Sequence, residues 1–414
     1  MHRKYDYTME NIIKYTQQKS RKVLIYSLFV MTTLLISGCE QYELGSPAAS
    51  TISDFTYTAT NGGKAPCTVT FTNKSLNAKG YLWDFGNGIT SNEANPVIEF
   101  VDPGLFTVKL TCVPNNDVHY NSLIKSIGLN IKDPNAGQTQ VLYFTSRSPE
   151  GGGAHYVILD DNAPVVQDFE SVPFSRPYGI AADTLNKKVY VSDYSEGVIY
   201  RFNADGTDPE KILDASVPGQ ELTGSPEALF ILGDKLYWGT VGGINRANLD
   251  GTNPEEWIAT GNNAPEFPID MQYDPISNKI YLVNDKTDYS GGFFSMNLDG
   301  SALTEHILDI DGTALEADFV NGKIYMAIYG PEPEDGIYMC NLDGSSLTKI
   351  GDYGSKATWG IGVDNKHNKI FWSYKTSNAD PDGKIIRANL NGSEAEDWIT
   401  GVSPHAIQVV FIKL

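Results

Sequence analysis

The sequence predicts an all-β protein, and three observations support that prediction. Short runs in which apolar and polar residues alternate follow one another along most of the chain, and a period of two is the pattern of a half-buried strand. Asn-Gly and Asp-Gly pairs, which tolerate the positive φ angles of two-residue hairpin turns, recur between these runs. The second half of the chain also repeats itself every 44 to 47 residues.

Length and charge narrow the class of protein further. A chain of 414 residues with 41% hydrophobic and 20% charged residues is long enough for two or more globular domains and too apolar to be disordered. Its 51 acidic residues outnumber its 31 basic ones, so the net charge is −20. Because binding to phosphates requires clustered Lys and Arg, we expect no nucleic-acid partner.

The N-terminus has the features of a secretory signal peptide. Residues 1–22 are rich in Lys and Arg, and residues 23–36 are mostly apolar. Fourteen residues are too few to cross a hydrocarbon core of about 30 Å as a helix. The apolar stretch runs into Ser37, Gly38 and Cys39, which resembles the lipobox of bacterial lipoproteins.

That resemblance implies a lipidation site and a location in the cell. Residues 1–38 would be the lipoprotein signal peptide, Cys39 would be acylated, and residues 39–50 would form a polar tether. The acidic body offers no basic patch for anionic lipids, so the membrane would be contacted through the lipid anchor only. We expect the protein on the cell surface or in the periplasm of a Gram-negative bacterium, anchored in the outer membrane.

Residues 51–133 read as a series of short strands separated by turn residues, which is typical of a β-sandwich. The segments YLWDFGNG (residues 81–88) and DPGLFTV (residues 102–108) resemble the PKD domain, an immunoglobulin-like sandwich. The resemblance implies that Trp83 fills the space between two sheets and that Asp84 braces the turn containing Gly86. Since no catalytic cluster stands out here, we interpret this domain as a spacer.

Three cysteines remain if Cys39 is acylated: Cys67, Cys112 and Cys340. An odd number leaves at least one thiol free. In the strand order of the PKD domain, Cys67 begins its strand and Cys112 ends a parallel strand of the opposite sheet. We therefore expect no disulfide between them. Residues 134–140, which contain Pro, Asn and Gly, follow as a linker.

The repeat in residues 141–414 predicts a six-bladed β-propeller. Its six copies each centre on an aromatic residue, and a four-stranded blade needs about 40 to 50 residues. The copies LYF, VYV, LYW, IYL, IYM and IFW resemble the YWTD repeat of low-density-lipoprotein-receptor class B propellers, with NHL-like propellers as relatives. No inner strand precedes the first copy, so residues 406–412 should supply it and close the ring, leaving no open edge.

The loops that enter the inner strands surround the central channel of such a propeller, and they carry the candidate site. Aromatic faces fringed by polar groups suit sugars, so we expect a ligand, above all a glycan, on this face. The candidate ligand-binding residues are Arg176, Tyr178, Glu227, Phe267, Asp270, Trp359 and His405.

Two alternatives remain open at this stage. The carboxylates of Glu227, Asp270, Glu316 and Asp318 form an oxygen-only set that favours Ca²⁺, as in gluconolactonase-like hydrolases or lyases, with His405 as general base. An extracellular protein is the other possible partner. We expect a binding protein without a cofactor rather than an enzyme, and the oligomeric state stays open. The glycine run 151–153 lacks the following helix that a phosphate cradle needs.

Overall fold

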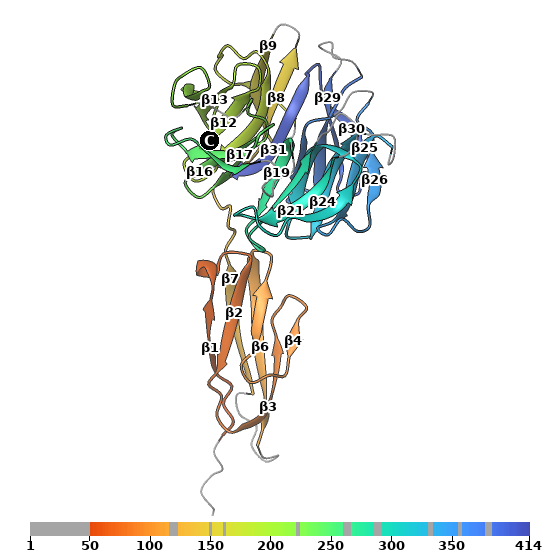
Figure 1. Ribbon diagram of the computed structural model, residues 1–414. Coiled ribbons are helices and arrows are strands. Elements are labelled where there is room, and N and C mark those ends of the chain that lie inside the picture. Colours follow the sequence, from red (N-terminus) through yellow and green to blue (C-terminus); the bar gives the residue numbers. More distant parts are fainter. Residues whose placement is uncertain are drawn as a thin grey trace, which may run out of the picture. The chain divides into compact units, whose positions relative to one another are not determined.

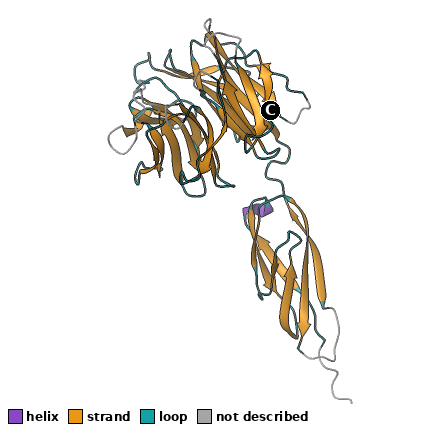
Figure 2. Ribbon diagram, turned by 90° about the vertical axis from the view of Figure 1, so that its right-hand side faces the viewer, coloured by secondary structure: helices purple, strands orange, loops and turns teal. Residues whose placement is uncertain are grey.

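The computed structural model describes residues 50–115, 123–148, 151–159, 163–220, 224–259, 266–284, 291–329, 334–354, 358–376 and 383–414. The signal peptide, Cys39 and nearly all of the tether therefore lie outside the described residues. The chain divides into two compact units, residues 1–134 and 135–414 (Figure 1). Strands make up almost all of the regular structure (Figure 2). Among the described residues, no helix is long and apolar enough to cross a membrane.

The first unit is a sandwich of two sheets, as predicted. One sheet has the order β1 (Phe55–Ala59), β2 (Cys67–Asn73), β5 (Val97–Phe100). The other has the order β4 (Thr90–Ser91), β3 (Ala78–Asp84), β6 (Gly104–Pro114), β7 (Ile124–Ile131), and a 3₁₀ turn, η1 (Asn61–Gly63), lies between β1 and β2. Trp83 is fully buried between the sheets, with ring centroids 4.9 Å from Phe55 and 5.4 Å from Phe71.

Local chemistry explains the turn that follows β3. The Asp84 carboxylate accepts a hydrogen bond from the N–H of Gly86 at 3.0 Å. Gly86 has a φ of 74°, and a Cβ there would lie 2.9 Å from the backbone of Thr107, so only glycine fits. Cys67 and Cys112 are both buried and free.

The second unit contains, in its described residues, six four-stranded antiparallel sheets arranged as blades. Given from inner to outer strand, the first two blades are β31 (Pro404–Ile412), β8 (Thr139–Ser148), β9 (Gly151–Ile158), β10 (Gln167–Asp168), and β11 (Pro177–Asp183), β12 (Lys188–Asp193), β13 (Val198–Asn203), β14 (Glu210–Asp214). The third and fourth blades are β15 (Leu229–Leu232), β16 (Lys235–Thr240), β17 (Gly243–Asn248), β18 (Glu255–Ala259), and β19 (Pro268–Asp274), β20 (Lys279–Asn284), β21 (Gly292–Asn297), β22 (Thr304–Leu308). The fifth and sixth blades are β23 (Asp311–Asp318), β24 (Lys323–Tyr329), β25 (Gly336–Asn341), β26 (Thr348–Gly351), and β27 (Ile361–Asp364), β28 (Lys369–Tyr374), β29 (Lys384–Asn389), β30 (Glu396–Thr400).

The C-terminal strand closes the ring, as the phase of the repeat predicts. β31 pairs antiparallel with β8, with a continuous register from Ile407 opposite Phe144 to Ile412 opposite Thr139 (Figure 1). The strand begins at Pro404, two residues before the predicted start. We call the sheet β31-β8-β9-β10 the latch blade, because it joins the last strand of the chain to the first strands of the propeller.

The repeated aromatic residue packs between neighbouring blades. Its six copies are all buried, from 0% exposed at Tyr143 to 6% at Tyr281. The Tyr143 hydroxyl donates to the carbonyl of Ala204 at 2.7 Å, and the Tyr190 hydroxyl donates to the carbonyl of Leu249 at 3.0 Å. Each of these carbonyls belongs to the following blade. A tyrosine here thus fills the space between two sheets and also ties them by a hydrogen bond.

Candidate functional site

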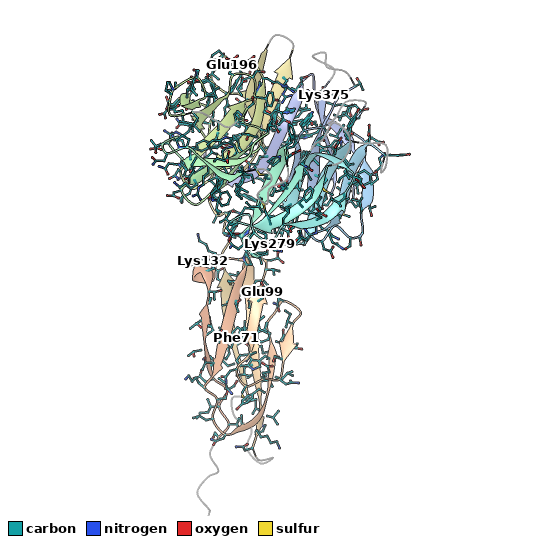
Figure 3. All side chains as sticks on the ribbon, in the orientation of Figure 1. Phe71, Glu99, Lys132, Glu196, Lys279 and Lys375 are labelled. Carbon is teal, nitrogen blue, oxygen red and sulfur yellow. The ribbon has the colours of Figure 1, made fainter. Side chains whose placement is uncertain are left out.

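All six inner strands begin at one end of the central channel, which we call the mouth. Four of them are irregular in their first residues, where the register with the second strand shifts: after Pro177, after Pro268, after Gly312 and after Pro404. The turns that follow the second strands lie at the same end. Figure 3 shows two residues of this end, Glu196 and Lys375, far from Lys279 at the other end of the propeller.

Three of the predicted residues come together at the mouth. Tyr178 lies edge-on to His405, with centroids 4.4 Å apart, and Trp359 is 5.7 Å from Tyr178 and 5.4 Å from His405. Tyr178 is 5% exposed and His405 is 1% exposed. These two rings are therefore packing partners rather than open platforms. Trp359 is half-buried and keeps part of its surface in contact with solvent.

Arg147, which the sequence did not point to, completes this group. Its Nε donates to the carbonyl of Pro177 at 3.0 Å, and its Nη2 donates to Nε2 of His405 at 2.5 Å. Its guanidinium carbon lies 4.5 Å from the centroid of the Tyr178 ring, which is cation–π geometry. Burial is the main reason that the pKa of Arg147 falls to about 10. Within the described part of the chain, Arg147 makes no salt bridge.

Two further cations surround His405. Arg176 is exposed and stacks on Tyr194, with 4.7 Å between the guanidinium carbon and the ring centroid. Burial, and then the positive charges of Arg147, Lys375 and Arg176, lowers the pKa of His405 well below its usual value. His405 is therefore neutral at physiological pH, which leaves Nε2 able to accept the hydrogen bond from Arg147. Three positive charges, those of Arg147, Arg176 and Lys375, therefore act on His405, and the carboxylates of Asp193 and Glu227 act on Arg147 in the same region.

Asp193 holds the loop that carries Arg176. Its carboxylate accepts hydrogen bonds from four backbone N–H groups, at 2.6 to 3.1 Å, and the side chain is fully buried. Two of the donors lie just before β11 and two lie just after β12. This one carboxylate thus joins the loop entering the inner strand to the turn that follows the second strand. The donors are Ser175, Arg176, Ser195 and Glu196.

Two other predicted residues lie apart from the aromatic group. Glu227 is 4% exposed and sits just before β15, and its charge raises the pKa of Arg147, opposing the effect of burial. Phe267 is half-buried just before β19, has a φ of 54°, and makes no ring contact with Tyr178, Trp359 or His405.

The channel beneath the mouth is narrow and acidic. A cavity of about 30 Å³ is lined by residues that include Asp270, Gln272 and Gln408, and a space of that size holds about two water molecules. The Asp270 carboxylate accepts from the N–H groups of Met271 and Leu315, both at 2.9 Å, and burial raises its pKa to about 7. Gln272 donates to Glu316 at 3.1 Å.

Glu316 shares this acidic environment with Asp270. Burial raises the pKa of Glu316 well above its usual value, and the neighbouring charges of Asp270 and Asp318 add to that effect. Both carboxyl groups of this narrow channel therefore keep their protons to a higher pH than exposed carboxyl groups do.

The position predicted for Asp318 is wrong. The sequence placed it in the loop entering an inner strand, but β23 begins at Asp311, so Asp318 ends that strand away from the mouth. There its carboxylate accepts from the backbone N–H and the side-chain amide of Asn321, at 3.0 and 2.7 Å. Asp183 and Asp274 bind the turns after their own strands in the same way. Among the described residues, no three His, Cys, Asp or Glu side chains are placed to hold a metal ion.

Comparison with known proteins identifies the first unit. Residues 54–119 match the family model of the PKD domain. The N-terminal unit contains a PKD domain. The strand order β1-β2-β5 facing β4-β3-β6-β7 and the buried Trp83 belong to that domain. No curated protein sequence matches the chain.

The second unit resembles solved propellers. A chain in the crystal structure of a nidogen/laminin complex aligns with a TM-score of 0.54 and 19% identity, over 65% of this chain and 98% of that one. The likeness supports a six-bladed propeller of the YWTD type, as a fold. A gluconolactonase of Xanthomonas campestris aligns with a TM-score of 0.43 and 15% identity, over 56% of this chain and 78% of that one. A putative TolB of Agrobacterium tumefaciens aligns with a TM-score of 0.46 and 14% identity, over 67% of this chain and 99% of that one.

Proposed function

We propose that the protein is a lipid-anchored binding protein whose propeller mouth takes an acidic glycan. The observation that carries this proposal is the environment of Arg147. Its guanidinium group is bonded to two neutral acceptors, the Pro177 carbonyl and His405, with Arg176 nearby. A partly buried arginine without a salt bridge among the described residues, in a chain of net charge −20, is suited to receive an anionic group.

The size of the channel limits how the ligand would bind. At about 30 Å³ the cavity is far smaller than the roughly 300 Å³ of the smallest ordinary ligand pockets. A sugar ring would therefore lie across the mouth, with a carboxylate directed to Arg147 and Arg176. The exposed part of Trp359 would offer an apolar surface to the ring face.

The anchor and the compartment belong to the same proposal. The basic segment, the apolar stretch and Ser37-Gly38-Cys39 support export and acylation of Cys39. The PKD domain between anchor and propeller then serves as a spacer. Radiolabelled palmitate should be incorporated by the wild-type chain and not by Cys39→Ala. Equal labelling of the two would contradict this part of the proposal.

Calorimetric titration tests the binding site. The titrants are an oligogalacturonate and a neutral cello-oligosaccharide of the same length. We expect heat of binding only with the acidic sugar, and weaker binding in Arg176→Ala. Arg246→Ala is the matched control, because Arg246 also stacks on an aromatic ring, at 5.1 Å from Trp257, but lies beside Glu255 on the outer strands of another blade.

Two results would contradict the glycan proposal. One is binding of both sugars that Arg176→Ala does not change. The other is no binding of either sugar, in which case a protein partner with an acidic surface becomes the better hypothesis. Because ion pairing at an exposed site weakens as salt screens it, binding of the acidic sugar should also decline with ionic strength.

A further inference from the structure

Three side chains of the latch blade form a continuous hydrogen-bonded chain. Ser146 on β8 lies with its Oγ 2.7 Å from Nε2 of His155 on β9. Nδ1 of the same imidazole is 2.8 Å from the carboxylate of Asp168 on β10. The three residues therefore lie on three neighbouring strands of one sheet, from the second strand to the outer edge.

The hydrogen bonds fix the roles of the three groups. An ionised carboxylate only accepts, so Nδ1 of His155 carries the proton. Nε2 then has a free electron pair, and the Ser146 hydroxyl donates to it. Burial lowers the pKa of His155, opposed by Asp168, so the imidazole is neutral at physiological pH. An activated serine nucleophile needs three groups. They are the hydroxyl itself, a neutral base that accepts the proton of the hydroxyl, and a carboxylate that orients the base.

Two other blades use the equivalent position in a different way. In the register of the sheets, Ser146 occupies the place that Asp193 occupies in the next blade and Asn284 in another, each opposite the first proline of an inner strand. Asp193 and Asn284 both bind backbone groups of the loops at the mouth. Ser146 binds His155 instead.

The surroundings keep the serine accessible and the imidazole in place. Ser146 is half-buried, and the His155 side chain is 17% exposed. Gly153 lies opposite Ser146 across β8 and β9, and a Cβ there would lie 3.1 Å from Nε2 of His155 and 3.7 Å from Oγ of Ser146. Glycine therefore leaves the space beside both reacting atoms open. Phe144 stacks on the imidazole, with centroids 4.8 Å apart.

We propose that Ser146, His155 and Asp168 form an acyl-transfer site that hydrolyses carboxylic esters. Ser146 Oγ attacks the ester carbonyl carbon while its proton passes to Nε2 of His155. The C–O bond to the alcohol breaks, and the alcohol leaves with the proton from His155. Water then attacks the acyl-serine, gives one proton to His155, and releases the carboxylic acid as Ser146 regains its proton. This inference goes beyond the binding function and uses none of its residues.

A second Ser–His pair in the propeller provides a matched control. Nε2 of His306 lies 2.8 Å from Oγ of Ser295, nearly the same distance as in the latch blade. Ser295 is only 1% exposed, and no carboxylate bond to Nδ1 of His306 is present among the described residues. Ser295→Ala thus removes a similar hydrogen bond without removing an accessible nucleophile.

The test is covalent labelling with a fluorophosphonate, read by peptide mass spectrometry, together with hydrolysis of p-nitrophenyl acetate. We expect the adduct on Ser146, and no adduct there in Ser146→Ala. His155→Ala should slow labelling and hydrolysis at least about 100-fold, the usual contribution of a general base. Asp168→Asn should slow them within about tenfold, because its carboxylate is 80% exposed and exposed pairs contribute little. Ser295→Ala should match the wild type.

Two results would overturn the proposal. One is labelling of Ser146 no faster than labelling of Ser295. The other is ester hydrolysis that Ser146→Ala leaves unchanged, with His155→Ala only lowering the melting temperature, as expected of a group that merely ties three strands. The glycan titration uses Arg176, outside this triad, so the two proposals fail separately.

Discussion

The half-buried Asp270 makes the stability of the propeller depend on pH. Its pKa rises from 3.8 to about 7 on folding, because burial disfavours the charged carboxylate. Between these two values the unfolded chain has lost the proton and the folded chain retains it. The contribution of Asp270 to stability therefore falls as pH rises from about 4 to about 7 and is constant above that. This rise of about three in the pKa of Asp270 corresponds to about 4 kcal/mol of unfolding free energy.

Asp270→Asn isolates this effect, because the amide cannot ionise. The amide oxygen can accept one of the two hydrogen bonds from Met271 and Leu315, so the variant loses some stability at every pH. The informative quantity is the slope with pH. The loss of stability between about pH 4 and pH 7 should be smaller in Asp270→Asn than in the wild type, by up to about 4 kcal/mol.

Guanidinium unfolding followed by tryptophan fluorescence measures that slope at a series of pH values. Asp299→Asn serves as the control, because hydrogen bonds within its exposed turn lower the pKa of Asp299 rather than raise it. It should leave the slope between pH 5 and 7 unchanged. Equal slopes for wild type and Asp270→Asn, or a steeper slope in the variant, would refute the assignment of a raised pKa to Asp270.

Three other perturbations test the fold and the loops. Deleting residues 404–414 exposes the inner side of β8, and calorimetry should show loss of the cooperative propeller transition; an unchanged transition would contradict the closure. Trp83→Ala should destabilise the PKD domain by about 3–5 kcal/mol while the propeller transition, recorded in the same scan, stays in place. Asp193→Ala leaves four N–H groups without their acceptor, and the loss of stability should be about 1–3 kcal/mol for each group that stays buried. The same variant should weaken glycan binding, because Asp193 holds the loop that carries Arg176. Unchanged stability and unchanged affinity would contradict this role of Asp193.

The architecture was predictable from the sequence because the number of blades equals the number of repeats along the chain. Six copies of one aromatic position, each near the start of a second strand, fix the number of blades whatever the loops do. The first copy, around Tyr143, lacks a preceding strand, so a closed ring needs one from the C-terminus. The pairing of β31 with β8 confirms that reasoning. The Asp84 turn was predictable for a similar reason, since its hydrogen bond is local.

The details of the mouth were less predictable because they depend on side-chain direction. Register shifts in the first residues of the inner strands turn Tyr178 and His405 into the protein, where the sequence suggested open faces. Asp318 was placed at the wrong end of its strand because β23 starts four residues before the predicted Leu315. When a strand starts earlier than predicted, a residue expected near its start lies near its end instead.

The residues that the sequence missed act across strands. Arg147 reaches His405, which is far away in the sequence and is brought near by the closure of the ring. Ser146, His155 and Asp168 have no common spacing or motif, and their alignment arises only from the register of β8, β9 and β10. Within the glycine run 151–153, Gly153 is the residue that leaves space beside the side chains of Ser146 and His155.

Titration of an oligogalacturonate into Arg147→Gln tests the central claim most directly. Glutamine keeps a donor but removes the charge, and the loss of a charge-assisted hydrogen bond should weaken binding about 10- to 100-fold. The variant's melting temperature, measured alongside, shows whether the propeller remains folded. If the acidic sugar binds the folded variant as tightly as it binds the wild type, the mouth around Arg147 is not the glycan site.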